Sequence, residues 1–426
     1  MDTTRRTILR GMAAAPLAAT AGGLLVPSTA RAAPGDFALT MRLSPSQYHR
    51  NWSAAADTLR RRLPHADLVR DVLRRAKRAG GILRSWGDRP GEGVEPTGFD
   101  YGFAWDPDTK DPHRKLDGKT AQWYPQGIST SVDGYGGTVG GRKVVAVSWY
   151  GYENYENRGA RISFIDVTGD PKRPRYEHVL LVEPSQPHGS DTATFNPVIM
   201  HAGGVAWVGN FLYVANLPGR LAPFKQGGVS AFDLTRMVKV EGADKRKAFG
   251  YDYILPLHHL YENRGGGRLR HSQLSLDRTR RNEPHSLIVS EFRDDGSRGR
   301  VVRWSLAPTG YLADGLSDED WLSKPYVQGA VAVGGDAYYA ANVRGSKGPR
   351  GSGASMESGQ SGESRESRER APKAGQLWLH KGRKGGPKKH GTLAIGPEDL
   401  SYDAGRLWCL AEHPHLRRVY RINLRR

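Results

Sequence analysis

The chain has 426 residues, of which 38% are apolar, and its formal net charge is +19 at pH 7. Beyond the first 32 residues, no apolar stretch approaches the ~18–20 residues that a membrane-spanning helix needs, which excludes a transmembrane bundle. The single cysteine, Cys409, excludes an intrachain disulfide framework and a multi-cysteine metal site. The 53 glycines, with many valine and aromatic residues, indicate a turn-rich β protein.

The amino-terminal residues have the three parts of an export signal. Arg5-Arg6 stand in a basic segment, an apolar run covers residues 11–26, and Ala30-Arg31-Ala32 offers the small residues of a cleavage site. The paired arginines favour a twin-arginine signal, with a general secretory signal as the alternative. We therefore expect residues 1–32 to be removed, the twin-arginine export machinery to be a partner, and the mature protein to be secreted as a monomer.

The positive charge restricts the partners less than it first suggests. A basic protein can bind nucleic acid, anionic lipid or an acidic polymer, but scattered arginines in turns produce the same total. For an exported chain we expect no nucleic-acid partner.

Residues 33–100 are predicted to hold one strand and a short helical segment. Apolar residues alternate over Phe37–Leu43, which is the period of a half-buried strand. Helical spacing follows from Tyr48 to Leu59 and again from Leu68 to Ala76.

Residues 101–426 contain an internal repeat. Each unit has a first strand that opens with polar or small residues, then a more apolar second strand and further strands. The units start at Gly127, Gly204, Ser272, Gly329 and Asp399. Repeated four-stranded sheets are typical of a propeller, so the predicted fold is an all-β, five-bladed β-propeller. A helical cap with a β-sandwich is an alternative, but it does not explain the recurrence.

The last unit has only three strands before the chain ends, and an open edge would invite aggregation. We expect Phe37–Leu43 to supply the missing strand and close the ring, with Ile82–Trp86 as the alternative. Residues 345–373 contain one large apolar side chain, Met356, so we expect a disordered loop there.

Several phrases of the repeat resemble a group of exported actinobacterial propeller proteins. They are Tyr124-Pro125-Gln126-Gly127, Ser148-Trp149-Tyr150, His201-Ala202-Gly203-Gly204-Val205-Ala206-Trp207, Leu274-Ser275-Leu276-Asp277-Arg278, Tyr326-Val327-Gln328-Gly329-Ala330 and Gly396-Pro397-Glu398-Asp399-Leu400-Ser401-Tyr402. The resemblance covers most of residues 120–424. It implies a five-bladed fold and export, and it implies no activity.

Polar residues open the first strands of the units, where a propeller gathers its inner strands around one axis. We therefore expect a polar funnel at one face, formed by Gln126, His201, His271, Gln328, Glu398 and Asp399. The predicted catalytic residues, with an imidazole as base and the carboxylate as acid, are His201, His271 and Glu398. The same three could instead hold a divalent metal. A third possibility is that the polar groups only bond one another and plug the axis.

The other predicted site residues bind the ligand. At the strand starts they are Gln126, Gln328 and Asp399, and in the aromatic and amide-rich segment after the first unit's second strand they are Trp149, Tyr150, Tyr152 and Asn154. Tyrosines and amides suit stacking on sugar rings and bonding to hydroxyls, although such a segment could also be a solvated loop packed on its blade.

Together these features predict an exported propeller that binds a polar ligand, anionic or carbohydrate, in its funnel. A small molecule or a polysaccharide fits, and hydrolysis or elimination is the chemistry that such residues could perform. The alternative is a non-catalytic extracellular scaffold that attaches to cell-wall polymers through its basic surface.

Overall fold

The computed structural model describes residues 37–42, 51–83, 86, 94–106, 117–152, 157–217, 227–263, 269–279, 285–312, 315, 317–343 and 373–424. The predicted export signal and nearly all of the predicted disordered loop lie outside these ranges. The chain divides into two compact units, residues 1–31 and 32–426, and all described residues belong to the second. Among them, no helix combines the length and the apolar character needed to cross a membrane.

The described fold is all-β with few, short helices. Its strands form sheets of twelve, eight and five strands, within which antiparallel pairing runs in four-stranded meanders. Numbered in chain order, meander 1 contains β5 (Trp123–Thr130), β6 (Val144–Gly151), β7 (Ala160–Asp166) and β8 (Arg175–Ser185). Meander 2 contains β10 (Val205–Val208), β11 (Phe211–Asn216), β12 (Gly228–Asp233) and β14 (Tyr253–Asn263).

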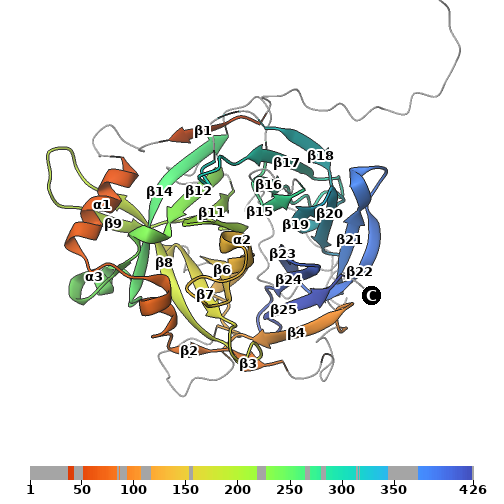
Figure 1. The fold of residues 1–426 in the computed structure, drawn as a ribbon, viewed down its shortest axis with the longest axis horizontal. Coiled ribbons are helices and arrows are strands. Elements are labelled where there is room, and N and C mark those ends of the chain that lie inside the picture. Colours follow the sequence, from red (N-terminus) through yellow and green to blue (C-terminus); the bar gives the residue numbers. More distant parts are fainter. Residues whose placement is uncertain are drawn as a thin grey trace, which may run out of the picture. The chain divides into compact units, whose positions relative to one another are not determined.

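The remaining meanders repeat this pattern (Figure 1). Meander 3 contains β15 (Gln273–Arg278), β16 (Ser286–Ser290), β17 (Arg300–Ser305) and β18 (Glu319–Leu322). Meander 4 contains β19 (Val327–Val333), β20 (Asp336–Ala341), β21 (Ala374–His380) and β22 (Lys388–Ile395). Meander 5 contains β23 (Pro397–Asp403), β24 (Arg406–Ala411), β25 (Arg418–Asn423) and β4 (Phe99–Ala104).

Short strands extend the meanders at their edges. They are β1 (Leu39–Arg42) on β14, β2 (Arg78–Ala79) and β9 (Thr194–Pro197) on β8, β3 (Gly81–Ile82) on β4, and β13 (Val238–Lys239) on β14. The helices are α1 (Trp52–Arg62), α2 (Ser131–Tyr135), α3 (Gly242–Lys247), a π-helical turn Leu68–Leu73, and 3-10 turns Leu234–Arg236 and Lys381–Arg383.

The apolar core is divided into clusters that each join neighbouring meanders, and these junctions form a closed cycle. Buried residues of meanders 1 and 2 share one cluster, meanders 2 and 3 the next, then 3 and 4, 4 and 5, and finally 5 and 1. Trp408 of meander 5, for example, shares a cluster with Trp149 of meander 1. The arrangement is propeller-like, because each meander buries both of its faces against the neighbouring meanders.

The prediction that Phe37–Leu43 completes the last sheet is wrong. The strand that pairs with β25 is β4, with Val419 opposite Phe103, and the orange β4 lies beside the blue β25 in Figure 1. Strand β1 instead pairs with β14, and the Phe37 carbonyl accepts the Trp304 indole N–H at 2.9 Å. The alternative, Ile82–Trp86, was also wrong in detail: Gly81–Ile82 pairs with β4 as a further outer strand. Period-two alternation shows that a strand has one buried face, but it does not name the partner.

The predicted helical segment is present but shorter than its pattern. Helix α1 begins at Trp52, where the Asn51 side chain accepts the Ala54 N–H at 2.8 Å as an N-cap. The second predicted helix is only the π-helical turn Leu68–Leu73, because the chain pairs as β2 from Arg78 onward.

Candidate functional site

Three inner strands carry their polar residues in β-bulges. The register of β5 shifts between Pro125 and Ile128, that of β19 between Val327 and Gly329, and that of β23 between Pro397 and Leu400. The residues inside these bulges are Gln126, Gly127, Gln328, Glu398 and Asp399. A bulge interrupts the regular pairing and redirects side chains, so the polar residues leave the ladder and turn toward their counterparts on other meanders.

Glycines let the inner strands approach one another at backbone distance. A Cβ on Gly204 would lie 2.0 Å from the Leu274 nitrogen, and one on Gly329 would lie 2.6 Å from the Asp399 Cα. Since real side chains do not tolerate such distances, these positions require glycine. The result is a tight junction of meanders 2 with 3 and 4 with 5, directly beside the polar residues.

Two glutamates form the centre of the site. Glu398 lies in the β23 bulge, and Glu412 directly follows β24, where its N–H donates to the Gly396 carbonyl at 3.0 Å. Their carboxyl groups hydrogen-bond each other. Both residues are buried. We call Glu398 and Glu412, together with the glutamines Gln126, Gln273 and Gln328, the carboxyl cluster.

Three carboxamides hold the glutamates. Gln273 Nε2 donates to Glu398 Oε2 at 3.3 Å and Gln328 Nε2 donates to Glu398 Oε1 at 3.1 Å, while Gln126 Nε2 donates to Glu412 Oε2 at 2.9 Å. The cluster therefore joins meanders 1, 3, 4 and 5 through side chains alone.

Burial changes the acidity of the two glutamates. It raises the pKa of Glu398 well above its usual value, and the nearby Glu412 and Asp399 carboxyls raise it further. Burial also raises the pKa of Glu412 to about 7, although the Arg417 guanidinium acts in the opposite direction. Two hydrogen-bonded carboxyls in a water-poor site do not both ionise easily, so the pair keeps a shared proton near neutral pH.

His201 joins the rim of the cluster. Its Nε2 lies 3.0 Å from Gln126 Oε1. Since the Gln126 amide nitrogen already donates to Glu412, this Oε1 is the acceptor, and His201 Nε2 carries the proton. Burial lowers the pKa of His201 to about 4, with a smaller effect from the positive Arg270, so the imidazole is neutral at pH 7. His201 and Gln328 are half-buried, so part of their surface stays exposed.

Tyr150 lies against His201, with 4.2 Å between ring centroids. Its hydroxyl is buried and has no hydrogen-bond partner among the described residues. Burial, and then the nearby Glu412 and Glu398 carboxyls, raise the pKa of this hydroxyl well above its usual value. A buried hydroxyl beside a carboxyl pair is a natural donor or acceptor for a bound ligand.

Asp399 faces the backbone of other meanders. Its Oδ2 lies 3.4 Å from both the Ile128 and the Val205 nitrogen, and these N–H groups donate to it. Burial raises the pKa of Asp399 well above its usual value despite these bonds. Asp399 therefore ties β23 to β5 and β10, and it does not line the exposed rim.

His271 does not belong to this site. Its ring is fully buried and stacks on Trp304 of meander 3, with 6.1 Å between centroids. No hydrogen bond or ring contact between described residues joins His271 to His201 or Glu398. The strand of meander 3 begins at Gln273, and it is this residue, two positions later, that reaches Glu398.

The predicted metal set is consequently not assembled. In the part of the chain that the structure describes, no group of three or more His, Cys, Asp or Glu side chains is placed to hold a metal ion. His201 is bonded to Gln126 and His271 packs on Trp304, so the two imidazoles do not converge on Glu398.

The aromatic segment is divided between two surroundings. Trp149 precedes Tyr150 on β6, and neighbouring residues of a strand point to opposite faces. The Trp149 indole N–H donates to Ser163 Oγ at 2.8 Å, and Trp149 packs in the apolar cluster between meanders 1 and 5, not in the carboxyl cluster. Tyr152 packs on Tyr124, with 5.3 Å between centroids, and Asn154 lies outside the described residues.

Glu412 and Gln273 were missed as site residues in the sequence. Glu412 does have a signal: it follows the second strand of meander 5 beside a bulge that opens with Pro397, just as Tyr150 lies beside a bulge that opens with Pro125. An alignment of the two Pro-Glu/Gln segments would have placed Glu412 and Tyr150 at equivalent positions. Gln273 has no comparable signal.

Comparisons with known proteins leave the family open. No family model matches the sequence, and no curated protein matches it. Among solved structures, the chain is similar to a protein from Parabacteroides distasonis with a provisional glycoside hydrolase description, at 11% identity and a TM-score of 0.32, covering 82% of this chain and 97% of that one. A Trypanosoma rangeli sialidase matches at 10% identity and a TM-score of 0.30, with 81% of this chain and 59% of the sialidase covered. Similarities of this size carry no weight for fold or function, and the resemblance to exported actinobacterial propeller proteins stays a prediction.

Proposed function

We propose that the protein is an exported, five-bladed β-propeller that binds a neutral, hydroxyl-rich ligand of the carbohydrate class at the carboxyl cluster and hydrolyses it there. The closed cycle of apolar clusters supports five blades, one for each meander. The basic, apolar and small-residue segments of residues 1–32 support export.

The observation that carries the proposal is the hydrogen-bonded carboxyl pair of Glu398 and Glu412. One member retains a proton near pH 7, and the other accepts a hydrogen bond, so an acid and a base lie side by side. General acids and bases work best when their pKa lies near the operating pH, and burial gives Glu412 a pKa of about 7.

The proposed reaction uses both members of the pair. Glu398 donates its proton to the oxygen of the bond that breaks, and Glu412 takes a proton from the water whose oxygen bonds to the carbon centre. The products are two hydroxyl compounds, and the pair again holds one proton. Because the carboxyls are in hydrogen-bond contact, they act as a proton-sharing pair, which differs from the two separated carboxylates of typical glycoside hydrolysis.

A neutral ligand fits this site better than an anionic one. Glu398, Glu412 and Asp399 are three buried carboxyls, and an anion would add to the repulsion that already raises the pKa values of Glu398 and Asp399. Sugar hydroxyls can instead bond to Gln328, His201 and the unpartnered Tyr150 hydroxyl.

The test is a panel of neutral oligosaccharides with α and β linkages, measured for binding by calorimetry and for cleavage by mass spectrometry. Glu398→Gln should lower turnover by about 100-fold or more while binding persists, since general acid catalysis contributes roughly 10²–10⁴. Gln328→Ala should weaken binding, and Gln376→Ala, a partly exposed glutamine on β21, is the matched control.

Two results would contradict the proposal. Undiminished turnover in Glu398→Gln would remove the carboxyl pair from the chemistry. Absence of binding across the panel, with attachment to anionic wall polymers that salt abolishes and Gln328→Ala does not alter, would favour the scaffold alternative.

A further inference from the structure

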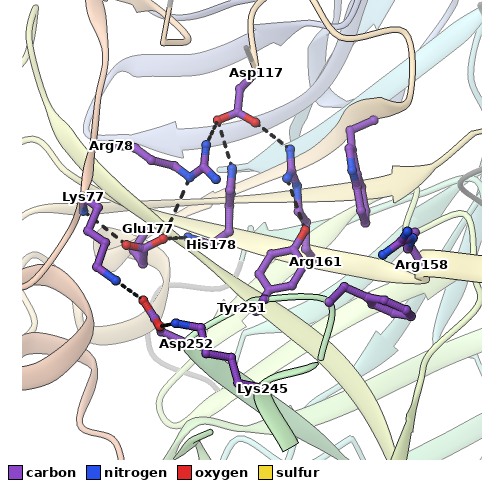
Figure 2. Close-up of a pocket in the computed structure, with 13 residues that line it drawn as sticks. Lys77, Arg78, Asp117, Arg158, Arg161, Glu177, His178, Lys245, Tyr251 and Asp252 are labelled. Carbon is purple, nitrogen blue, oxygen red and sulfur yellow. Dashed lines mark hydrogen bonds and ion pairs between the residues drawn. The ribbon is translucent and has the colours of Figure 1, made fainter. Parts of the chain in front are cut away.

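A second concave region lies beside meander 1, apart from the carboxyl cluster. It is a cavity of about 370 Å³ lined by residues of β2, β7 and β8, by Asp117, and by the segment that joins α3 to β14. We call it the Asp117 cavity. Figure 2 shows its charged side chains converging from these separate segments. Its volume lies at the lower end of the range for small-molecule sites.

The floor of the cavity is a network of buried ion pairs. The buried Asp117 carboxylate accepts Arg78 Nη1 and Arg161 Nη2, each at 2.9 Å. His178 Nε2 lies 3.0 Å from the same carboxylate, and Tyr176 donates its hydroxyl to it at 2.8 Å. Burial, and then the Arg161 charge, lower the pKa of His178 to about 3, so this imidazole is neutral. Asp117 therefore faces two guanidinium ions, and the buried Glu177 carboxylate lies beside one of them, Arg78.

The rim contains more cations than carboxylates. Asp252 accepts the ammonium groups of both Lys77 and Lys245. Glu177 lies 3.9 Å from Arg78, and Arg158 places its guanidinium 4.5 Å from the centre of the Phe249 ring. Among the described residues that line the cavity, five are cations and three are carboxylates. Lys77 and Lys245 keep 53% and 40% of their side chains exposed, so both ammonium groups can be reached from solvent.

Aromatic rings provide flat walls between these charges. Trp123, Phe249 and Tyr251 line the cavity, and Arg161 stacks on Trp123 at 4.3 Å and donates to the Tyr251 hydroxyl at 3.3 Å. Arginine held on an aromatic face loses little freedom when it binds a carboxylate or phosphate in its plane. Flat walls with fixed guanidinium groups suit a ring that bears an oxyanion.

We propose that the Asp117 cavity binds a small ring compound that bears a carboxylate or a phosphate, such as an acidic monosaccharide. The rim cations Lys245 and Arg158 bind the oxyanion, and the Phe249 and Tyr251 side of the cavity takes the ring. This site is independent of the carboxyl cluster, since anions are favoured in one and disfavoured in the other.

The test is calorimetry of the full chain with three probes at low ionic strength: glucuronate, glucose 6-phosphate and glucose. We expect the two anions to bind and glucose not to bind. A stronger response to glucuronate assigns a carboxylate ligand, and a stronger response to glucose 6-phosphate assigns a phosphate ligand. Equal binding of all three, or none, overturns the proposal.

Paired substitutions locate the binding. Lys245→Gln and Arg158→Gln should each weaken anion binding by about tenfold, the size of one charge-assisted contact in a partly enclosed site. Lys247→Gln, which removes the same charge from the same helix α3 without lining the cavity, should leave the affinity unchanged. An equal loss of anion affinity in Lys245→Gln and Lys247→Gln would show a general effect of charge and would overturn the proposed site. Oligosaccharide binding at the carboxyl cluster should be unaltered in all three variants, so failure of one proposal is distinguishable from failure of the other.

Discussion

Asp399 in the carboxyl cluster region and Asp117 in its cavity are both fully buried, yet their acidities move in opposite directions. Burial raises the pKa of Asp399 well above its usual value although backbone N–H groups donate to it, and the Asp133 carboxyl raises it further. Burial acts on Asp117 in the same direction, but His178, Arg161 and Arg78 more than offset it and hold its pKa well below the usual range.

This difference shows that burial alone does not determine the state of a carboxyl group. The carboxyl cluster reduces its negative charge by retaining protons, whereas the Asp117 cavity pairs its buried carboxylate with guanidinium ions. The first region can therefore supply protons to a neutral ligand, whereas the second keeps its fixed charges and can bind an anion. Arg417 connects the two, since its Nε donates to the Glu412 carbonyl at 2.6 Å and its Nη1 to the Asp117 carbonyl at 2.9 Å.

The largest expected effect comes from making the same substitution in both regions. Asp117→Asn removes the carboxylate that pairs with the buried Arg161 and leaves Arg78 with only Glu177 at 3.9 Å, and it should lower the free energy of unfolding by about 3–5 kcal/mol. Burial disfavours the ionised form of Asp399, and Asp399→Asn keeps an oxygen for the Ile128 and Val205 N–H groups, so its change should stay within about 1 kcal/mol. Urea unfolding at pH 7 measures the free energy of unfolding of both variants. Equal losses would refute the proposed difference between Asp117 and Asp399.

A smaller effect should appear in the pH dependence of stability. The folded pKa values of Glu398 and Glu412 are raised, so the folded state binds protons that the unfolded state has released. Their contribution to stability is thus present at low pH and is lost as pH rises from the ordinary glutamate value of 4.5 through about 7. The loss amounts to at most about 1.4 kcal/mol per pH unit for each retained proton.

Buried histidines produce the opposite trend, since burial lowers the pKa of His178 to about 3 and of His201 to about 4. The measurement is therefore a difference: the unfolding free energy of the wild type minus that of the Glu398→Gln/Glu412→Gln variant, in which the histidine terms cancel. This difference should decline with rising pH. Glu241→Gln, at an exposed glutamate whose pKa Lys239 lowers, should not reproduce the decline, and a flat difference would show that the pair holds no extra proton.

The repeat in the sequence predicted which residues would meet, because bulges at recurrent strand starts leave a visible pattern. Gln126, Gln328 and Glu398 each stand beside glycine or a second polar residue, and these pairs are the bulges that bring them together. His201 also reaches this group. His271 does not, since its position relative to the strand start differs and Trp304 covers its ring.

Other features depended on pairing between distant segments, which a single sequence does not display. Two segments of the sequence, Phe37–Leu43 and Ile82–Trp86, were candidates to complete meander 5, and the strand that pairs there is a third, Phe99–Ala104. The Asp117 network joins Arg78, Arg161 and His178, which share no motif or spacing. Such contacts between distant segments set the charge balance in the interior. The polar residues at the strand starts therefore do not indicate the Asp117 cavity.

The smallest expected effect concerns the Tyr150 hydroxyl. Because this buried hydroxyl has no partner among the described residues, Tyr150→Phe removes a desolvated group without breaking a hydrogen bond. The free energy of unfolding should be unchanged or higher by up to about 1 kcal/mol, as measured by urea unfolding. Tyr213→Phe is the control, since its hydroxyl donates to the Gly310 carbonyl at 2.7 Å and accepts the Leu312 N–H at 3.0 Å, and its loss should destabilise by about 1–3 kcal/mol.

The Tyr150→Phe variant also tests whether the Tyr150 hydroxyl contacts the ligand. If the Tyr150 hydroxyl bonds to a sugar, Tyr150→Phe should weaken oligosaccharide binding several-fold while stability holds, and anion binding in the Asp117 cavity should not change. Unaltered oligosaccharide binding would leave the hydroxyl without a role in the carboxyl cluster. A stability loss as large as that of Tyr213→Phe would mean that the hydroxyl has a partner in the folded protein. The contrast between the ion-paired carboxylates of the Asp117 cavity and the proton-retaining carboxyl cluster would then no longer extend to this residue.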